Sequence, residues 1–482
     1  MYNADFEIPN KERLARMFAL LGLAGIAVAL SLGNFTVLAA IITLPVLIIF
    51  TLYIIQYPII LFFTFFTWNY FILGIRRYLP MEGSSVSMDI LLVSTLVLIV
   101  IHGALTQDIR WKYAFNILTL VTFLWMIYCL LEIMNPTGML KAWILSRSLI
   151  FNGLIISVIT SLLITKYRQI DTIVTLYSVF TLLAIAKVLM QRYIGFDSYE
   201  LRWLNEGGGA LTHLIHSGTR YFSFFTDAGN FGSNMGCSAV IFGILTFSAS
   251  RKGRAIYYGI LSVLSLYAMF LSGTRGAMIV PLGGVALYIL ISKNYKAIIG
   301  GGILLTAVYC FFVFTYIGES NSLIRRMRSS FRPTRDGSFN VRRENQKKLA
   351  VYLKNRPFGE GLGLSGGENR KISVRFTTQI PHDSWYVKIW VETGIVGLIL
   401  YLAGLIAVVI KCARIIMFKI KNKKLKGILS AFLCGIFGMM LSSYGNAIWG
   451  QFPTMIIAYV FLSLILKGAY FDKQIETQKR LI

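Results

Sequence analysis

The feature that most constrains this chain is the recurrence of apolar stretches that are long enough to cross a bilayer. Hydrophobic residues make up 56% of the 482 residues and charged residues only 14%, whereas soluble domains carry roughly 25% charged residues. A transmembrane helix needs about 20 mainly apolar residues, and such stretches recur along almost the whole sequence. The sequence therefore predicts an all-α, polytopic integral membrane protein with about 12 to 14 transmembrane helices and one large outer loop.

The predicted spans divide the chain into three regions. Residues 1–191 hold N-terminal transmembrane helices, residues 192–410 form a core with two polar loops (192–233 and 318–384), and residues 411–482 combine a basic loop with the last helices. The candidate spans are 17–32, 36–54, 57–75, 88–105, 113–133, 148–165, 172–191, 234–249, 255–272, 276–292, 297–316, 386–410, 428–445 and 453–470.

The positive charge of the chain indicates its orientation. The formal net charge is +26, but the cations collect in short loops between apolar stretches, as cytoplasmic anchoring requires, so we expect no nucleic-acid partner. The strongest short basic loop, 411–427, should be cytoplasmic. Alternation of the spans then places the loops 192–233 and 318–384 outside. Arg76 and Arg77 fall outside as well, against the rule.

The long loop 318–384 is the most unusual polar segment. It contains fourteen lysines and arginines against six aspartates and glutamates. Loops of more than about 60 residues escape the positive-inside rule, so this charge needs another cause. Guanidinium groups pair bidentately with phosphate oxygens, and an arginine-rich outer surface therefore most simply meets phosphate.

Within this loop, residues 341–353 have helical character, with an apolar stripe of Leu349, Tyr352 and Leu353. A glycine-rich turn at 357–363 ends the helix and allows close backbone approach. A surface helix with a glycine turn explains this pattern equally well. His382 follows at the membrane border, where it is either a general base or an interfacial histidine without a chemical role.

Two other outer segments carry polar residues beside predicted spans. Asp227 precedes the eighth span and is either part of a functional site or a helix N-cap. Arg275 lies in the corner Ser-Gly-Thr-Arg-Gly-Ala at 272–277, where it either meets an anion or carboxylate or reaches the interface. His213 and His216 are spaced like a metal pair, but no third ligand accompanies them.

These pieces, taken in order, resemble the O-antigen ligase/polymerase family of bacterial envelope glycosyltransferases. The resemblance covers roughly residues 220–398. It rests on the corner at 272–277, on an arginine 15 residues before a Pro-Phe-Gly-x-Gly-x-Gly turn (Arg342 and Pro357), and on a Pro-His element followed by Glu-Thr-Gly-Ile-Val-Gly-Leu at 392–398.

The resemblance implies a glycosyltransferase of the bacterial inner membrane that works on the periplasmic face and needs neither a metal nor a cofactor. Its donor would be a glycan on undecaprenyl diphosphate, and its acceptor would be lipid A-core for a ligase or a glycan for a polymerase. The residues do not separate these two activities. A transporter or flippase for lipid-linked oligosaccharides is the alternative, although few charges lie within the spans and no internal repeat is evident.

Carried onto this chain, the resemblance implies that Arg342 binds the diphosphate of the donor. Arg343 would take this role if the register of the helix is shifted by one. Arg220 and Arg275 would be supporting phosphate contacts or structural pins, and His382 would activate the acceptor hydroxyl.

Two departures put the base in question. Asp383 stands where the family pattern has Asn, Ser or Gln, and Gly394 comes 12 residues after the histidine instead of 11. Either the helix begins with one extra residue, or Asp383 shares or takes over the role of the base.

Overall fold

The computed structural model describes residues 52–79, 83–215, 218–293, 295–331 and 337–480. The elements up to residue 219 are α3 (Ile59–Tyr78), α4 (Ser84–Thr106), η1 (Trp111–Tyr113), α5 (Ile117–Leu131), η2 (Glu132–Met134), α6 (Leu140–Leu145), η3 (Ser148–Asn152), α7 (Gly153–Leu163), α8 (Tyr167–Tyr193), α9 (Ser198–Glu206), α10 (Ala210–His213) and the short antiparallel strands β1 (Leu214–Ile215) and β2 (Gly218–Thr219). The later elements are α11 (Ala228–Ser248), α12 (Lys252–Leu271), η4 (Arg275–Met278), α13 (Ile279–Ser292), α14 (Tyr295–Phe314), α15 (Ser322–Arg328), η5 (Ser329–Phe331), α16 (Gly337–Leu353), η7 (Gly367–Lys371), α17 (Phe376–Gln379), α18 (Trp385–Phe418), α19 (Lys423–Ser442), α20 (Thr454–Leu466) and α21 (Gly468–Arg480).

Among the described residues, nine helices are long and apolar enough to cross a membrane, or ten if the bent pair α20 and α21 forms one span. The chain is an all-α polytopic membrane protein, as the sequence predicts. The predicted span 17–32 and nearly all of 36–54 lie outside the described residues. Each remaining predicted span overlaps a helix.

Side-chain caps explain several helix starts. The side chain of Asp227 accepts hydrogen bonds from the backbone N–H groups of Gly229 and Asn230 at 2.6 and 2.9 Å, so α11 begins six residues before the predicted span at 234. Ser384 caps α18 in the same way through the N–H of Val387. These caps satisfy backbone donors that the first helical turn leaves without partners.

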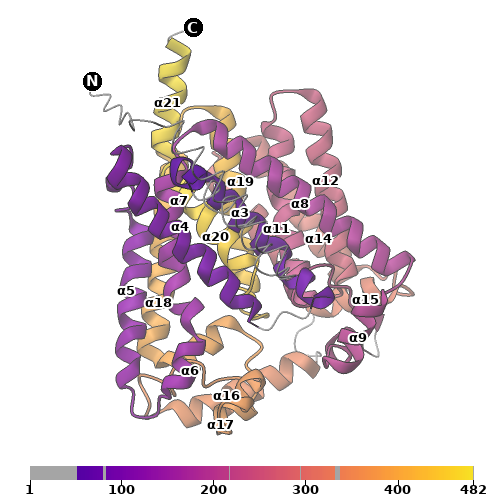
Figure 1. The fold of residues 1–482 in the computed structure, drawn as a ribbon. Coiled ribbons are helices and arrows are strands. Elements are labelled where there is room, and N and C mark those ends of the chain that lie inside the picture. Colours follow the sequence, from indigo (N-terminus) through magenta and orange to yellow (C-terminus); the bar gives the residue numbers. More distant parts are fainter. Residues whose placement is uncertain (1–51, 80–82, 216–217, 294, 332–336, 481–482) are drawn as a thin grey trace, which may run out of the picture.

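Helices α11, α13 and α19 pack closely on one another, and α11 and α19 lie in the middle of the view in Figure 1. Glycines make this possible. A Cβ at Gly435 would lie 2.8 Å from Cys237 Sγ, and a Cβ at Gly284 would lie 2.8 Å from Val240 Cγ2. Small residues at helix interfaces are the usual means by which membrane helices approach closely.

The polar loops gather at one end of the bundle, which we call the loop end. In Figure 1 it is the lower end, where α9, α15, α16 and α17 lie. The basic turn between α18 and α19 lies at the opposite end of the 34-residue α18. The loops 192–233 and 318–384 are thus on one side and 411–427 on the other, as the alternation of predicted spans requires.

Arg77 has a structural reason to lie at the loop end. Its guanidinium donates to the carbonyl oxygens of Ser223, at 2.8 Å, and Phe225, and it packs on the rings of Trp203 and Phe222 at 4.5 and 4.4 Å. The residue therefore pins the loop 192–233 to α3. Its charge does not report orientation, because carbonyl groups and aromatic faces hold it there.

Candidate functional site

A break in α18 positions the centre of the loop end. Gly394 lies inside this helix with φ 67° and ψ −171°, a left-handed φ that favours glycine. The glycine turn 357–363 fits against the break. The N–H groups of Glu360 and Gly361 donate to the carbonyl oxygens of Val391 and Glu392 at 2.9 and 3.0 Å. The turn and the helix start are therefore fixed relative to each other.

A buried carboxylate stabilises this turn. Glu360 is only 2% exposed, and its carboxylate accepts from Arg375 Nη1 at 2.8 Å, from Tyr352 Oη at 3.1 Å and from Arg356. Three partners compensate the loss of hydration that burial imposes on a carboxylate. These two arginines thus serve the architecture of the loop.

The predicted helix at 341–353 exists as α16 and packs by the predicted stripe. Leu349 and Leu353 are buried with Val387 and Val391 of α18, and Tyr352 packs at the edge of this cluster. Burial of two leucines fixes α16 on α18. This is the contact that holds the N-terminal half of α16, with Arg342, beside the start of α18.

Arginines from three segments meet at the Ser-Gly-Thr-Arg corner. Arg275 belongs to the corner itself. Arg220 donates from Nη2 to Thr274 Oγ1 at 2.9 Å, and Arg326 donates from Nε to the Gly273 carbonyl at 2.5 Å. Gly273 has φ 57°, and a Cβ there would lie 3.2 Å from Arg220 Cγ, so both the backbone and the packing require glycine.

The charges of these arginines act on one another. Burial, followed by the charges of Arg220 and Arg275, lowers the pKa of Arg326 to about 10. Burial, together with the charge of Arg342, also lowers the pKa of Arg220, although Asp227 opposes this effect. Arg275 is repelled by Arg342 and Arg220. A cluster of like charges of this kind is stabilised when an anion binds.

Arg342 connects this cluster to the start of α18. Its Nε lies 3.4 Å from Asp383 Oδ2, and a Cβ on Gly445 would lie 3.9 Å from its Nη1. About a third of the Arg342 side chain is exposed, which leaves guanidinium donors accessible. Arg343 is exposed on α16, because consecutive residues of a helix point about 100° apart.

His382 is buried and directly precedes Asp383, the partner of Arg342. Its side chain is 7% exposed, and Nε2 lies 3.6 Å from Glu368 Oε1. Its Nδ1 is buried without a hydrogen-bond partner in the described structure. The ring packs so closely on Gly366 that a Cβ there would overlap the imidazole. Burial, followed by the charge of Lys388, lowers the pKa of His382, against the opposing charges of Glu368, Glu392 and Asp383.

A second group of charges lies near His382 and consists of Glu368 from η7 and of Lys388 and Glu392 from the first turns of α18. Lys388 Nζ is 3.8 Å from both Glu368 Oε1 and Glu392 Oε1. Glu392 is fully buried, and its Oε1 accepts from Ser365 Oγ at 2.6 Å. The ammonium group of Lys388 is thus held between two carboxylates, one on the surface and one inside the protein.

The structure brings together five of the six residues that sequence reasoning selected, namely Arg220, Arg275, Arg342, His382 and Asp383. It adds Arg326, Glu368, Lys388 and Glu392, which that reasoning passed over. Lys388 and Glu392 carry a signal that was readable, because a charged pair four residues apart at the start of a membrane helix marks a polar face. Arg326 carried none, since its neighbours Arg325 and Arg328 share its charge.

His213 has a structural role in this site. Its Nδ1 lies 2.9 Å from the Gly209 carbonyl oxygen, and its Nε2 accepts from the N–H of Ala228 at 3.1 Å. Both ring nitrogens are therefore engaged in joining α10 to the start of α11. His216, the other member of the spacing pair, lies outside the described residues.

A comparison with protein families matches part of the chain. A family model described as O-antigen ligase matches residues 260–402, a segment that runs from α12 through the arginine corner and the long loop into α18. Searches of curated proteins and of solved structures returned no match. The match supports the resemblance to the O-antigen ligase/polymerase family through residues 260–402.

Proposed function

We propose that this protein transfers a glycan from a lipid diphosphate to an acceptor hydroxyl on the periplasmic face of the bacterial inner membrane. Undecaprenyl diphosphate is the lipid that the family implies, and the acceptor is lipid A-core or another glycan. The observation that carries the proposal is the contact between Arg342 and Asp383, because it joins the arginine cluster to the residue that follows the buried His382.

The arginine cluster would bind the diphosphate. Transfer breaks the bond between the anomeric carbon and the phosphate oxygen, and the electron pair of that bond remains on the leaving diphosphate. The cluster would stabilise this developing charge through four arginines, Arg220, Arg275, Arg326 and Arg342. Such electrostatic stabilisation is strongest in a site that partly excludes water. A bound diphosphate would offset the mutual repulsion of these arginines.

His382 would accept the proton of the attacking hydroxyl. Burial, followed by the charge of Lys388, lowers the pKa of His382, which favours the neutral imidazole that a base requires. Asp383 has φ 47° and directs its carboxylate to Arg342, so we assign it to holding that arginine. Attack and departure on opposite faces of the sugar invert the anomeric centre.

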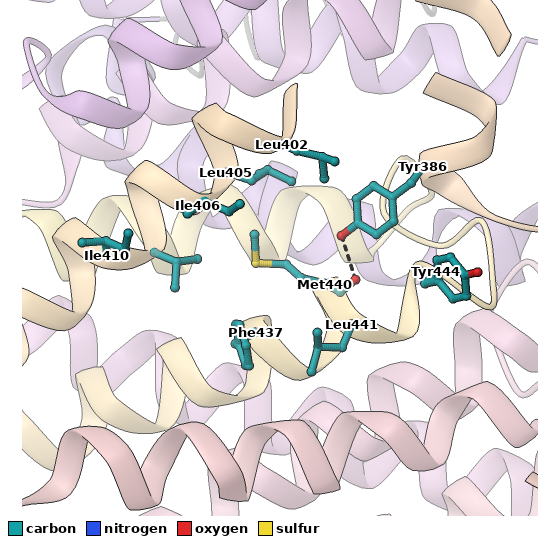
Figure 2. Close-up of a pocket in the computed structure, with 10 residues that line it drawn as sticks. Tyr386, Leu402, Leu405, Ile406, Ile410, Phe437, Met440, Leu441 and Tyr444 are labelled. Atoms are coloured by element: carbon teal, nitrogen blue, oxygen red, sulfur yellow. Dashed lines mark hydrogen bonds between the residues drawn. The ribbon is translucent and has the colours of Figure 1, made fainter. Parts of the chain in front are cut away.

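An apolar groove would receive the lipid chain of the donor. It has a volume of about 560 Å³ between α18 and α19. Figure 2 shows Leu402, Leu405 and Ile406 facing Phe437 and Leu441 across it.

The groove leads towards the arginine cluster. Tyr386 and Tyr444 stand at one end of it (Figure 2), and the Tyr386 hydroxyl donates to the Met440 carbonyl at 2.7 Å. Tyr444 precedes Gly445, which borders Arg342. A polyprenyl chain in the groove would therefore bring its diphosphate to the arginines.

Deletion of the gene tests the proposed function. We expect the envelope lipopolysaccharide to change on a gel, with complementation by the wild-type gene and not by His382→Ala. Single-repeat product identifies a polymerase, and bare core with accumulated lipid-linked polymer identifies a ligase. An unchanged glycan pattern, or accumulation of lipid-linked glycan on the cytoplasmic face as a flippase defect would give, contradicts the proposal.

Cysteine labelling tests the proposed face. Val351 of α16 is 79% exposed, and Lys423 starts α19 at the opposite end of the bundle. In a variant with the native cysteines replaced, an impermeant reagent added outside intact inner membranes should label Val351→Cys and spare Lys423→Cys. The opposite result places the site in the cytoplasm.

A further inference from the structure

A small polar pocket lies beside the first turn of α18, where Trp385 and Lys388 line it. Its volume is about 130 Å³. It is bounded by the segment between α6 and η3, by the loop around Gly363, and by the start of α18. Its lining residues are Leu145, Ser146, Ser148, Leu149, Gly363, Asn369, Trp385, Lys388 and Gly450.

Polar groups in this pocket have hydrogen-bond donors and acceptors that other described protein groups do not use. Within the described structure, Ser148 makes no side-chain hydrogen bond, and Asn369 uses its Nδ2 on the Ser365 carbonyl at 2.7 Å, which leaves Oδ1 available. Lys388 Nζ approaches its two carboxylates only to 3.8 Å. A hydroxyl donor-acceptor, an amide acceptor and an ammonium donor thus face one cavity.

The pocket is adjacent to the proposed base. Glu368 Oε1 lies 3.6 Å from His382 Nε2 and 3.8 Å from Lys388 Nζ, so one carboxylate touches both the histidine and the wall of the pocket. Trp385, three residues after His382, supplies an aromatic wall, with Gly450 packed against its ring. A molecule in the pocket that contacts Lys388 would therefore be separated from His382 only by the side chain of Glu368.

The charge of the pocket selects against a phosphate. Lys388 is flanked by Glu368 and Glu392, so its surroundings carry at least as much negative as positive charge. An anion would be repelled here and attracted to the arginine cluster. A neutral, hydroxyl-rich group can use every polar group present without adding charge.

We propose that this pocket is the binding subsite for the acceptor sugar. Ser148, Asn369 and Lys388 bind hydroxyls of one sugar ring, Trp385 forms its apolar wall, and the hydroxyl to be glycosylated points to His382. The proposal rests on the proposed glycosyl transfer. It separates the two substrates by charge, with the diphosphate on the arginines and the neutral sugar between Lys388 and Asn369.

Competition by a soluble sugar tests the subsite. Mild acid would release the sugar of the acceptor as a probe without its lipid, from lipid A-core if the deletion phenotype is that of a ligase and from the lipid-linked glycan if it is that of a polymerase. The purified protein would be assayed for transfer with increasing amounts of this probe. We expect it to inhibit the wild type, and to inhibit Ser148→Leu and Asn369→Leu at least roughly tenfold less well, since each removes a hydrogen bond and fills the pocket.

The outcomes separate the subsite from the function. Ser148→Ala, which keeps the pocket open, should raise KM for the acceptor with little change in kcat. Ser198→Leu, on an exposed serine of α9, is the matched control and should match the wild type. Equal inhibition of wild type, Ser148→Leu and Asn369→Leu by the probe overturns the subsite, whereas absence of transfer by the wild type overturns the function itself.

Discussion

Arg342 and Asp383 lie 3.4 Å apart, between Nε of the arginine and Oδ2 of the aspartate, and join two segments that are 41 residues apart in the chain. The pair is exposed enough to exchange partners, since 35% of the arginine and 46% of the aspartate side chain is accessible. It connects the arginine cluster to the segment that carries His382 and engages only Nε of Arg342. An incoming phosphate can therefore bind Arg342 from the opposite side.

We expect Arg342→Lys to lose activity by roughly tenfold or more, because lysine keeps the charge and loses the bidentate fork. Kinetics at saturating acceptor would show the loss, with expression unchanged. Arg325→Lys, at an exposed arginine of α15, is the matched control. A loss in Arg343→Lys with an active Arg342→Lys would instead show that Arg343 binds the donor.

His382→Ala should lose activity by about 10²–10⁴-fold, the usual contribution of a general base. Asp383→Asn should lose less than His382→Ala, because asparagine tolerates the left-handed backbone at this position and only the contact with Arg342 is weakened. Rates of the purified variants measure both effects. An active His382→Ala with an inactive Asp383→Asn would assign the base to the carboxylate.

The pH dependence follows from the surroundings of His382. The base works when neutral, and burial and Lys388 lower its pKa below the ordinary 6.5. The rate should therefore persist below pH 6.5 and fall as the pH drops through the lowered pKa. Glu368→Gln removes an anion that faces the ring and should move the acid limb to still lower pH. A limb that stays in place would show that Glu368 does not act on His382.

The sequence predicted the helical membrane fold, because hydropathy alone sets the spans, and it predicted the stripe of α16 from spacing. Because the predicted spans alternate in direction, the sequence also placed the five candidate site residues on the same side of the membrane. It could not predict Arg326, whose role depends on reaching the Gly273 carbonyl from another segment. Nor could it explain Arg77, which aromatic rings and carbonyls from residues 203–226 hold at the loop end.

Gly394 is a further position whose role depends on a distant segment. Gly394 is the point where the helix breaks and the Pro357 carbonyl approaches, so that a Cβ would overlap it. We expect Gly394→Ala to displace the glycine turn and reduce activity together with thermal stability. Gly302→Ala on α14, where a Cβ meets open space, is the control. A fully active Gly394→Ala would show that the docked turn is dispensable.

The groove between α18 and α19 makes a prediction about the donor lipid. Ile406→Trp places a large ring in the groove, so KM for the lipid-linked donor should rise several-fold with little change in KM for the acceptor. Ile399→Trp, on an exposed part of α18 outside the groove, should match the wild type. Equal donor KM values in both variants would place the lipid chain elsewhere.

The most direct test of the central claim is to count lipid diphosphate released against glycan transferred by the purified protein in liposomes. The proposed reaction predicts one diphosphate lipid for each glycan joined to the acceptor, and loss of both products in His382→Ala. Release of diphosphate without transfer, or transfer that survives in His382→Ala at the wild-type rate, would contradict it.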